Sequence, residues 1–268
     1  MRVLVVDRDP IVQQIVGAKL ENMGHQVFEE AAKNTAVERL ANEEFDVIML
    51  DPSPLTSPRP IVLNIRRNVR NYPYIFMLSD TISAEEALKS GVNDLIAKPV
   101  NSEDLSKKMA CAEYFSKLVA RIGDDSEDFP SAGGVIAKSA FNQLFLSAID
   151  RADRYGEQTY VLFISVNNYQ EIKDLDGNYA AEYASAKLSQ YLVRLRRQSD
   201  IIGQTEKHEF TLLLQRPLYE TEPVEAANRF AEALGKYEGF SEDQTAKAKI
   251  KVTLLSVPTG RVIVEHIV

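Results

Sequence analysis

Four polar residues, each placed directly after a short apolar run, are the part of this sequence best suited to chemistry. They are Asp7 after residues 3–6, Asp51 after residues 45–50, Ser79 after residues 74–78, and Lys98 after residues 95–97. Apolar runs of this length are typical of strands buried on both faces of a parallel sheet. Because ligands of open α/β folds bind at the carboxyl ends of such strands, two carboxylates, a hydroxyl and an ammonium are expected together there. This set suits the acceptance of a phosphoryl group.

Each of the four side chains has a predicted role in that chemistry. The carboxylate of Asp51 is already charged and can attack a phosphoryl donor without a general base. Asp7 and Asp51 are candidate ligands for a divalent cation that neutralises the phosphoryl oxygens. Lys98 offers a point charge to one of those oxygens, and Ser79 offers a hydrogen bond once the group is in place.

The elements that position these residues alternate between strand and helix over residues 1–122. Five strand–helix units in this order predict a doubly wound parallel sheet, a flavodoxin-like (βα)5 domain. The last helix, from residue 102, keeps an apolar spacing close to 3.5 as far as Ile122, so it is expected to extend as a connector. Residues 123–134 are acidic and polar and are interpreted as a linker.

Residues 135–268 show a different order of elements. Helices are predicted over 140–155, 180–196 and 222–234, and strands over 160–166, 250–257 and 262–267. Two further strands, 201–204 and 210–214, flank a short connection that predicts an antiparallel hairpin. This mixture indicates an α+β domain.

The first domain resembles a response-regulator receiver domain. The resemblance is carried by residues 5–7, by Asp51, by Ser79, and by residues 91–94 leading to Lys98-Pro99. It implies that Asp51 is the phosphoacceptor, that Ser79 and Lys98 form the phosphate switch, that Mg²⁺ binds at Asp7 and Asp51, and that a histidine kinase is a partner. An unrelated flavodoxin-like domain with polar strand ends is the alternative.

One departure from the receiver pattern concerns the metal. Receiver domains carry two consecutive acidic residues after the first strand, whereas here Asp7 is followed by Arg8. A guanidinium cannot ligate a cation; it could take the cation's place and pair with Asp51, or Asp9 could substitute as a ligand. Two interpretations stay open: a phosphorylated receiver and a pseudo-receiver whose state is fixed without phosphate.

Residues 130–268 resemble a GGDEF domain, the domain of diguanylate cyclases. The resemblance rests on residues 133–141, residues 151–156, and Glu209-Phe210 followed by an apolar strand. The signature reads Glu206-Lys207-His208-Glu209-Phe210, so side chains replace the two glycines that admit phosphate. The metal-binding aspartate corresponds to Ser165, and the guanine-reading positions to Lys173 and Glu182. This pattern predicts a catalytically inactive, degenerate and C-terminally trimmed domain.

A second family feature is retained. Arg197 and Asp200 form an Arg-x-x-Asp motif that five residues separate from Glu206, and Arg229 follows in the next predicted helix. In this family the motif marks an inhibitory site, and the resemblance implies that cyclic di-GMP binds at these three residues. An arginine fork suits a guanine edge or a phosphate. The alternative is a surface ion pair between Arg197 and Asp200.

Composition narrows the function further. The net charge of −8 disfavours DNA binding through a broadly basic surface. The lone cysteine, Cys111, fits a reducing compartment, and neither a membrane span nor a signal peptide is apparent, which predicts a bacterial cytoplasmic protein. Two functions remain: a cyclic di-GMP effector acting on an unknown protein, and a scaffold that binds no nucleotide. A homodimer through the receiver or its extended helix is expected.

Overall fold

The computed structural model describes residues 1–69, 71–124, 126–129, 133–197, 200–240 and 245–268. The chain forms two compact units. The first comprises Met1–Arg121 with Ile149–Glu157 and Pro258–Gly260, and the second comprises Ile122–Ala148, Gln158–Val257 and Arg261–Val268. Of the predicted linker 123–134, residues 125 and 130–132 lie outside the described residues.

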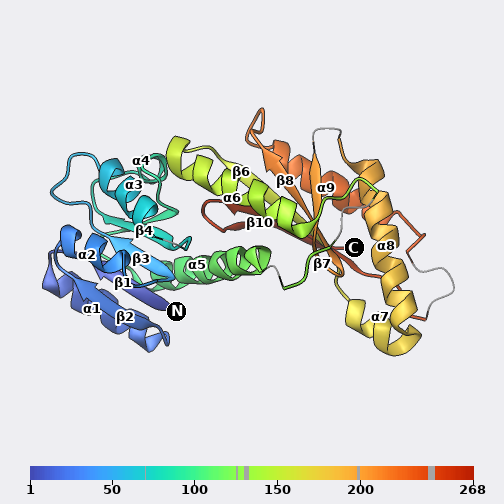
Figure 1. Cartoon of the computed structure of the whole chain (residues 1–268), viewed down its shortest axis with the longest axis horizontal. Helices are drawn as coiled ribbons and strands as arrows, with labels where there is room; N and C mark the ends of the chain where they lie inside the picture. Colours follow the sequence, from blue (N-terminus) through green and yellow to red (C-terminus); the bar gives the residue numbers. More distant parts are fainter. Residues whose placement is uncertain (70, 125, 130–132, 198–199, 241–244) are drawn as a thin grey trace. The chain divides into compact units, whose positions relative to one another are not determined.

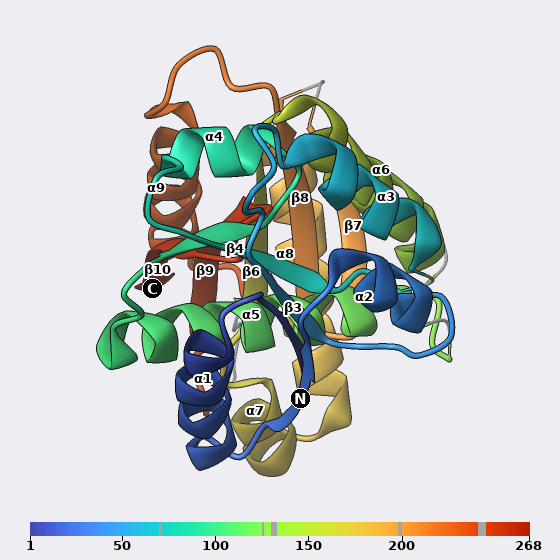
Figure 2. The same ribbon diagram turned by 90° about the vertical axis from the view of Figure 1, so that its left-hand side faces the viewer.

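The first domain is a parallel five-stranded sheet in the order β2-β1-β3-β4-β5, as expected for a flavodoxin-like fold. Its elements are β1 Arg2–Val6, α1 Pro10–Asn22, β2 Gln26–Glu30, α2 Lys33–Leu40, β3 Val47–Leu50, α3 Arg59–Asn68, β4 Tyr74–Ser79, α4 Ala84–Lys89, β5 Asp94–Ala97 and α5 Ser102–Gly123. Helices α1 and α5 lie on one side of the strands, and α3 and α4 lie on the other (Figures 1 and 2).

Alternation along the strands explains the two layers of helices. Successive side chains of a strand point to opposite faces, and in β3 and β4 the side chains on both faces are buried. One face packs against helices α2, α3 and α4 in a single apolar cluster. Burial of both faces is what makes these strands continuous apolar runs.

The second domain is an antiparallel five-stranded sheet in the order β10-β9-β6-β8-β7. Its elements are α6 Lys138–Tyr155, β6 Thr159–Val166, α7 Tyr169–Asp176, α8 Asn178–Leu195, β7 Ile201–Glu206, β8 Glu209–Gln215, α9 Glu222–Gly235, β9 Ile250–Val257 and β10 Val262–Ile267. Helices α7, α8 and α9 contribute to one apolar cluster with the sheet. On β7, a Cβ at Gly203 would lie 2.6 Å from Phe141 of α6, so only glycine admits this helix.

Most predicted elements of the second domain are confirmed, with one omission. The hairpin of β7 and β8 and the strands β6, β9 and β10 lie where the sequence predicts them. Helix α7 has no counterpart among the predicted elements; it is only 8 residues long, and Ile172 is its one fully buried residue. An apolar pattern this short is difficult to recognise in a sequence.

Candidate functional sites

The four residues of the predicted phosphoacceptor site lie at or directly after the ends of their strands, as expected, and three of them form one ionic cluster. Lys98 Nζ lies 2.6 Å from Asp7 Oδ2 and 2.6 Å from Asp51 Oδ2. The side chain of Asp7 is 1% exposed and that of Asp51 is 11% exposed. One ammonium therefore bridges two nearly buried carboxylates at the carboxyl edge of the sheet.

The remaining oxygens of both carboxylates accept backbone hydrogen bonds. Asp9 N donates to Asp7 Oδ1 at 2.9 Å, and Ser53 N donates to Asp51 Oδ1 at 2.6 Å. Burial raises the pKa of Asp51, but the hydrogen bonds from Lys98 and Ser53 outweigh burial and hold this pKa below its usual value. Burial lowers the pKa of Lys98, but its hydrogen bonds to the two carboxylates outweigh burial and raise it overall.

Ser79 does not join this cluster through a described hydrogen bond. Its Oγ accepts from the backbone N–H groups of Thr81 and Ile82, at 3.2 Å each. The hydroxyl is therefore engaged in the loop that follows its own strand, as a turn-forming serine commonly is.

The pairing of Arg8 with Asp51, one of the possibilities that the sequence left open, is not found among the described residues. Arg8 is exposed, and the ion-pair partner of Asp51 is Lys98. The suggested substitution of Asp9 as a metal ligand also finds no support, because Asp9 Oδ1 caps helix α1 by accepting from Ile11 N at 2.9 Å.

Sequence reasoning missed a further cation at this edge. Lys33, at the start of α2, donates from Nζ to the backbone carbonyl of Ser53, two residues after Asp51. Its pKa is lowered first by burial and then by the nearby charge of Arg8, while Asp51 and Asp7 act in the opposite direction. The ammonium of Lys33 is thus within electrostatic reach of both carboxylates.

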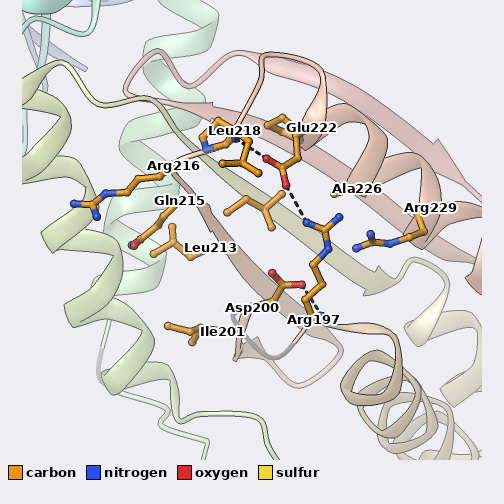
Figure 3. A pocket seen from close by; sticks show the side chains of 13 residues that line it. Arg197, Asp200, Ile201, Leu213, Gln215, Arg216, Leu218, Glu222, Ala226 and Arg229 are labelled. Carbon is orange, nitrogen blue, oxygen red and sulfur yellow. Dashed lines mark hydrogen bonds and ion pairs between the residues drawn. The ribbon is translucent and has the colours of Figure 1, made fainter.

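In the second domain, the three predicted nucleotide-binding residues line one pocket of about 300 Å³. Arg197 and Asp200 lie between α8 and β7, and Arg229 lies on α9 (Figure 3). The side chain of Arg229 points toward Arg197, whereas Arg216, another lining residue, points away from them (Figure 3). The volume is at the lower end of the range of about 300–1,000 Å³ typical of ligand pockets.

The hydrogen bonds of this pocket differ from a simple surface ion pair between Arg197 and Asp200. Asp200 Oδ2 accepts from the backbone N–H of Arg197 at 2.9 Å, so it closes the turn of the motif. The guanidinium of Arg197 instead pairs with Glu222, with Nη1 2.9 Å from Oε1 (Figure 3). Glu222 Oε2 accepts from Leu218 N at 2.7 Å. These bonds from Leu218 and Arg197 lower the pKa of Glu222.

The signature residues 206–210 span the hairpin of β7 and β8, with Lys207 and His208 forming its tight turn. His208 stacks on Tyr169, with ring centroids 5.0 Å apart, and its Nε2 lies 3.8 Å from Glu206 Oε2. Ser185 Oγ donates to the carbonyl of Lys207 at 2.6 Å. Throughout the described parts of the chain, no group of three His, Cys, Asp or Glu side chains is placed to hold a metal ion.

Comparison with known proteins identifies both domains. Residues 3–110 match the model of the response regulator receiver domain, and residues 131–261 match that of the diguanylate cyclase GGDEF domain. Sensor protein GacS of Pseudomonas syringae pv. syringae is 29% identical over 114 residues, which are 40% of this chain and 13% of GacS. Transcriptional regulatory protein CrdR of Helicobacter pylori is 25% identical over 115 residues, which are 40% of this chain and 53% of CrdR.

Two similar solved structures each cover about two fifths of this chain. Chemotaxis protein CheY4 of Vibrio cholerae is 28% identical and covers 41% of this chain and 95% of its own, with a TM-score of 0.37. The receiver domain of sensor histidine kinase PA1611 from Pseudomonas aeruginosa, solved with a magnesium ion in its active site cleft, is 27% identical. It covers 40% of this chain and 91% of its own, with a TM-score of 0.35. Among the described residues, no helix combines the length and apolar character needed to cross a bilayer.

Proposed function

Because the chain consists of a response regulator receiver domain followed by a GGDEF domain, we propose that it is a signalling effector that binds cyclic di-GMP without making it. The ligand occupies the pocket of Arg197, Asp200 and Arg229 in the second domain. The observation that carries this proposal is the convergence of these three side chains, from two separate parts of the chain, on one pocket.

The chemistry of the pocket suits a guanine dinucleotide. Arginine presents a fork of donors that matches the O6 and N7 acceptors of guanine or the oxygens of a phosphate. Asp200 accepts from Arg197 N through Oδ2, and among the described residues no hydrogen bond is recorded at its Oδ1, which can accept from guanine N–H groups. Apolar lining residues such as Ile201 and Leu213 supply a surface for the base.

The same proposal assigns no cyclase activity to the GGDEF domain. Phosphodiester synthesis requires a metal that activates the attacking hydroxyl and holds the triphosphate. Ser165 lies near the end of β6 opposite Glu209 in the sheet, and the His208 ring is already stacked on Tyr169. Incubation with GTP and Mg²⁺ is expected to yield no cyclic di-GMP by chromatography; product formed by the purified chain would contradict this assignment.

Glu222 is expected to limit the affinity of the pocket. It neutralises the Arg197 guanidinium in the free protein, so an anionic ligand must displace it. Glu222→Gln keeps the shape and an acceptor for Leu218 N but removes the charge. Because ion pairs at the protein surface are individually weak, the gain should be modest, and the affinity for cyclic di-GMP should rise by roughly fivefold in calorimetric titration.

Glu232→Gln is the matched control for this experiment. It removes the same charge from the same helix, but Glu232 pairs with Lys236 and does not line the pocket. Equal affinities for the two variants would refute the role of Glu222. If neither the variants nor the wild type binds the dinucleotide, the effector proposal fails and the scaffold function replaces it.

The receiver domain is the input of this effector, with Asp51, Ser79 and Lys98 as its phosphoacceptor and switch residues. Its partner is a histidine kinase or a phosphotransfer protein. One similar solved structure holds the histidine phosphotransfer signaling protein Ypd1 of Saccharomyces cerevisiae together with the receiver domain of its downstream response regulator Ssk1. The output passes to a further protein, and we place the chain in the bacterial cytoplasm, with a homodimer as its working assembly.

A further inference from the structure

The phosphoacceptor edge of the receiver domain does not suit the divalent cation that its family implies. Mg²⁺ requires a near-octahedral set of oxygen ligands and gives up its water reluctantly. Asp7 and Asp51 are the carboxylates that the family pattern assigns to the cation, and each forms an ion pair with Lys98. Their other oxygens accept from backbone N–H groups. Arg8 stands where a further acidic ligand is expected.

A second lysine engages an oxygen of the same edge. The carbonyl of Ser53 belongs to the loop that follows Asp51, and it is the kind of hard oxygen that Mg²⁺ prefers. This carbonyl accepts a hydrogen bond from the ammonium of Lys33. The contact joins the start of α2 to the phosphoacceptor loop.

From these contacts we propose that Lys33 and Lys98 together replace the divalent cation in this receiver domain. Their two positive charges balance the two negative charges of Asp7 and Asp51, and their ammonium groups bind the oxygens that an ion would need. A dication entering this edge would meet Lys33, Lys98 and Arg8 at once. The phosphoacceptor pocket is therefore assembled without metal, and its Mg²⁺ affinity is low.

The proposal is tested by restoring the metal site. In the Arg8→Asp/Lys33→Gln double variant, an acidic ligand replaces the arginine, and glutamine keeps a donor for Ser53 while removing the charge. The control is Arg8→Asp/Lys107→Met, which has the same net charge and retains Lys33. Lys107 is 73% exposed on α5 and pairs with Glu103. Titration with MgCl₂ is followed by calorimetry and by the midpoint of thermal unfolding.

We expect the wild-type chain to show no rise in its unfolding temperature at millimolar Mg²⁺. The Lys33→Gln double variant should bind Mg²⁺ at least about tenfold more tightly than the control, with a matching rise in its unfolding temperature. Far-UV circular dichroism checks that both variants are folded. Submillimolar binding of Mg²⁺ by the wild type would overturn the proposal, as would equal affinities of the two double variants. The nucleotide pocket plays no part in this test.

Discussion

Arg197→Ala is expected to weaken the binding of cyclic di-GMP by roughly a hundredfold. The guanidinium offers several donors to a guanine edge or a phosphate, and hydrogen bonds to charged groups contribute about 1.5–3 kcal/mol each. A loss near 3 kcal/mol corresponds to about a hundredfold in Kd. The substitution also removes the ion-pair partner of Glu222, so the negative charge of Glu222 faces the ligand without the Arg197 guanidinium.

The matched control for this variant is Arg194→Ala. Arg194 lies on the last turn of α8, is exposed, and does not line the pocket. It therefore reports the general effect of removing one positive charge from this part of the surface. Titration calorimetry at fixed salt should show wild-type affinity for this control. Equal losses in the two variants would mean that charge alone attracts the ligand and that Arg197 does not contact it.

Lys98→Met is expected to destabilise the receiver domain by about 3 kcal/mol at neutral pH. Removing one partner of a buried ion pair costs about 3–5 kcal/mol, because the other charge stays buried and unpaired. In this cluster two carboxylates lose the same ammonium, and Asp7 is almost fully buried. Because the side chain of Lys98 is 19% exposed, water partly screens the ion pairs, and the loss is expected at the lower end of that range. Urea unfolding followed by circular dichroism measures the loss.

The effect should depend on pH in a defined direction. The pKa of Asp51 is lowered in the folded wild type, so the stability from this carboxylate is present above its unfolded pKa of about 3.9. That stability is lost as the pH falls through the folded pKa. Without Lys98, burial opposes ionisation of Asp51 and raises its pKa. The difference between wild type and Lys98→Met should therefore shrink as the pH is lowered from 7 towards 4.

Lys89→Met controls for the loss of a lysine. Lys89 is 67% exposed and pairs with Glu85 one turn away on α4, so its removal should change the stability little, because water screens such a pair. A Lys98→Met variant that is as stable as this control at pH 7 would contradict the bridging role of Lys98. A difference that does not change with pH would contradict the role of the two carboxylates.

The placement of the phosphoacceptor residues could be predicted because it follows from a simple rule. Parallel strands buried on both faces appear as apolar runs, and the residue after each run lies at one edge of the sheet. Asp7, Asp51 and Lys98 obey this rule and form one cluster. The antiparallel hairpin of β7 and β8 could also be predicted, because a short polar connection separates its two apolar runs.

The contacts that the sequence did not reveal depend on side chains far apart in the chain. Lys33 reaches a backbone carbonyl 20 residues away, and any residue type offers such a carbonyl. Glu222 pairs with Arg197, 25 residues away in the chain. It lies on α9, and the sequence gives no sign of which charged residue of that helix faces Arg197. The sequence left the partner of Arg8 open, because adjacency to Asp7 in sequence does not fix where a long side chain points. Register and loop geometry decide these contacts.

The most direct test of the central claim is a titration of the purified full chain with cyclic di-GMP and, separately, with cyclic di-AMP. The two dinucleotides share their phosphates and differ in the base edges that an arginine and a carboxylate read. Saturable micromolar or tighter binding of cyclic di-GMP, together with at least about tenfold weaker binding of cyclic di-AMP, is the predicted result. Absence of binding by the wild-type chain, or equal affinity for both dinucleotides, would contradict it.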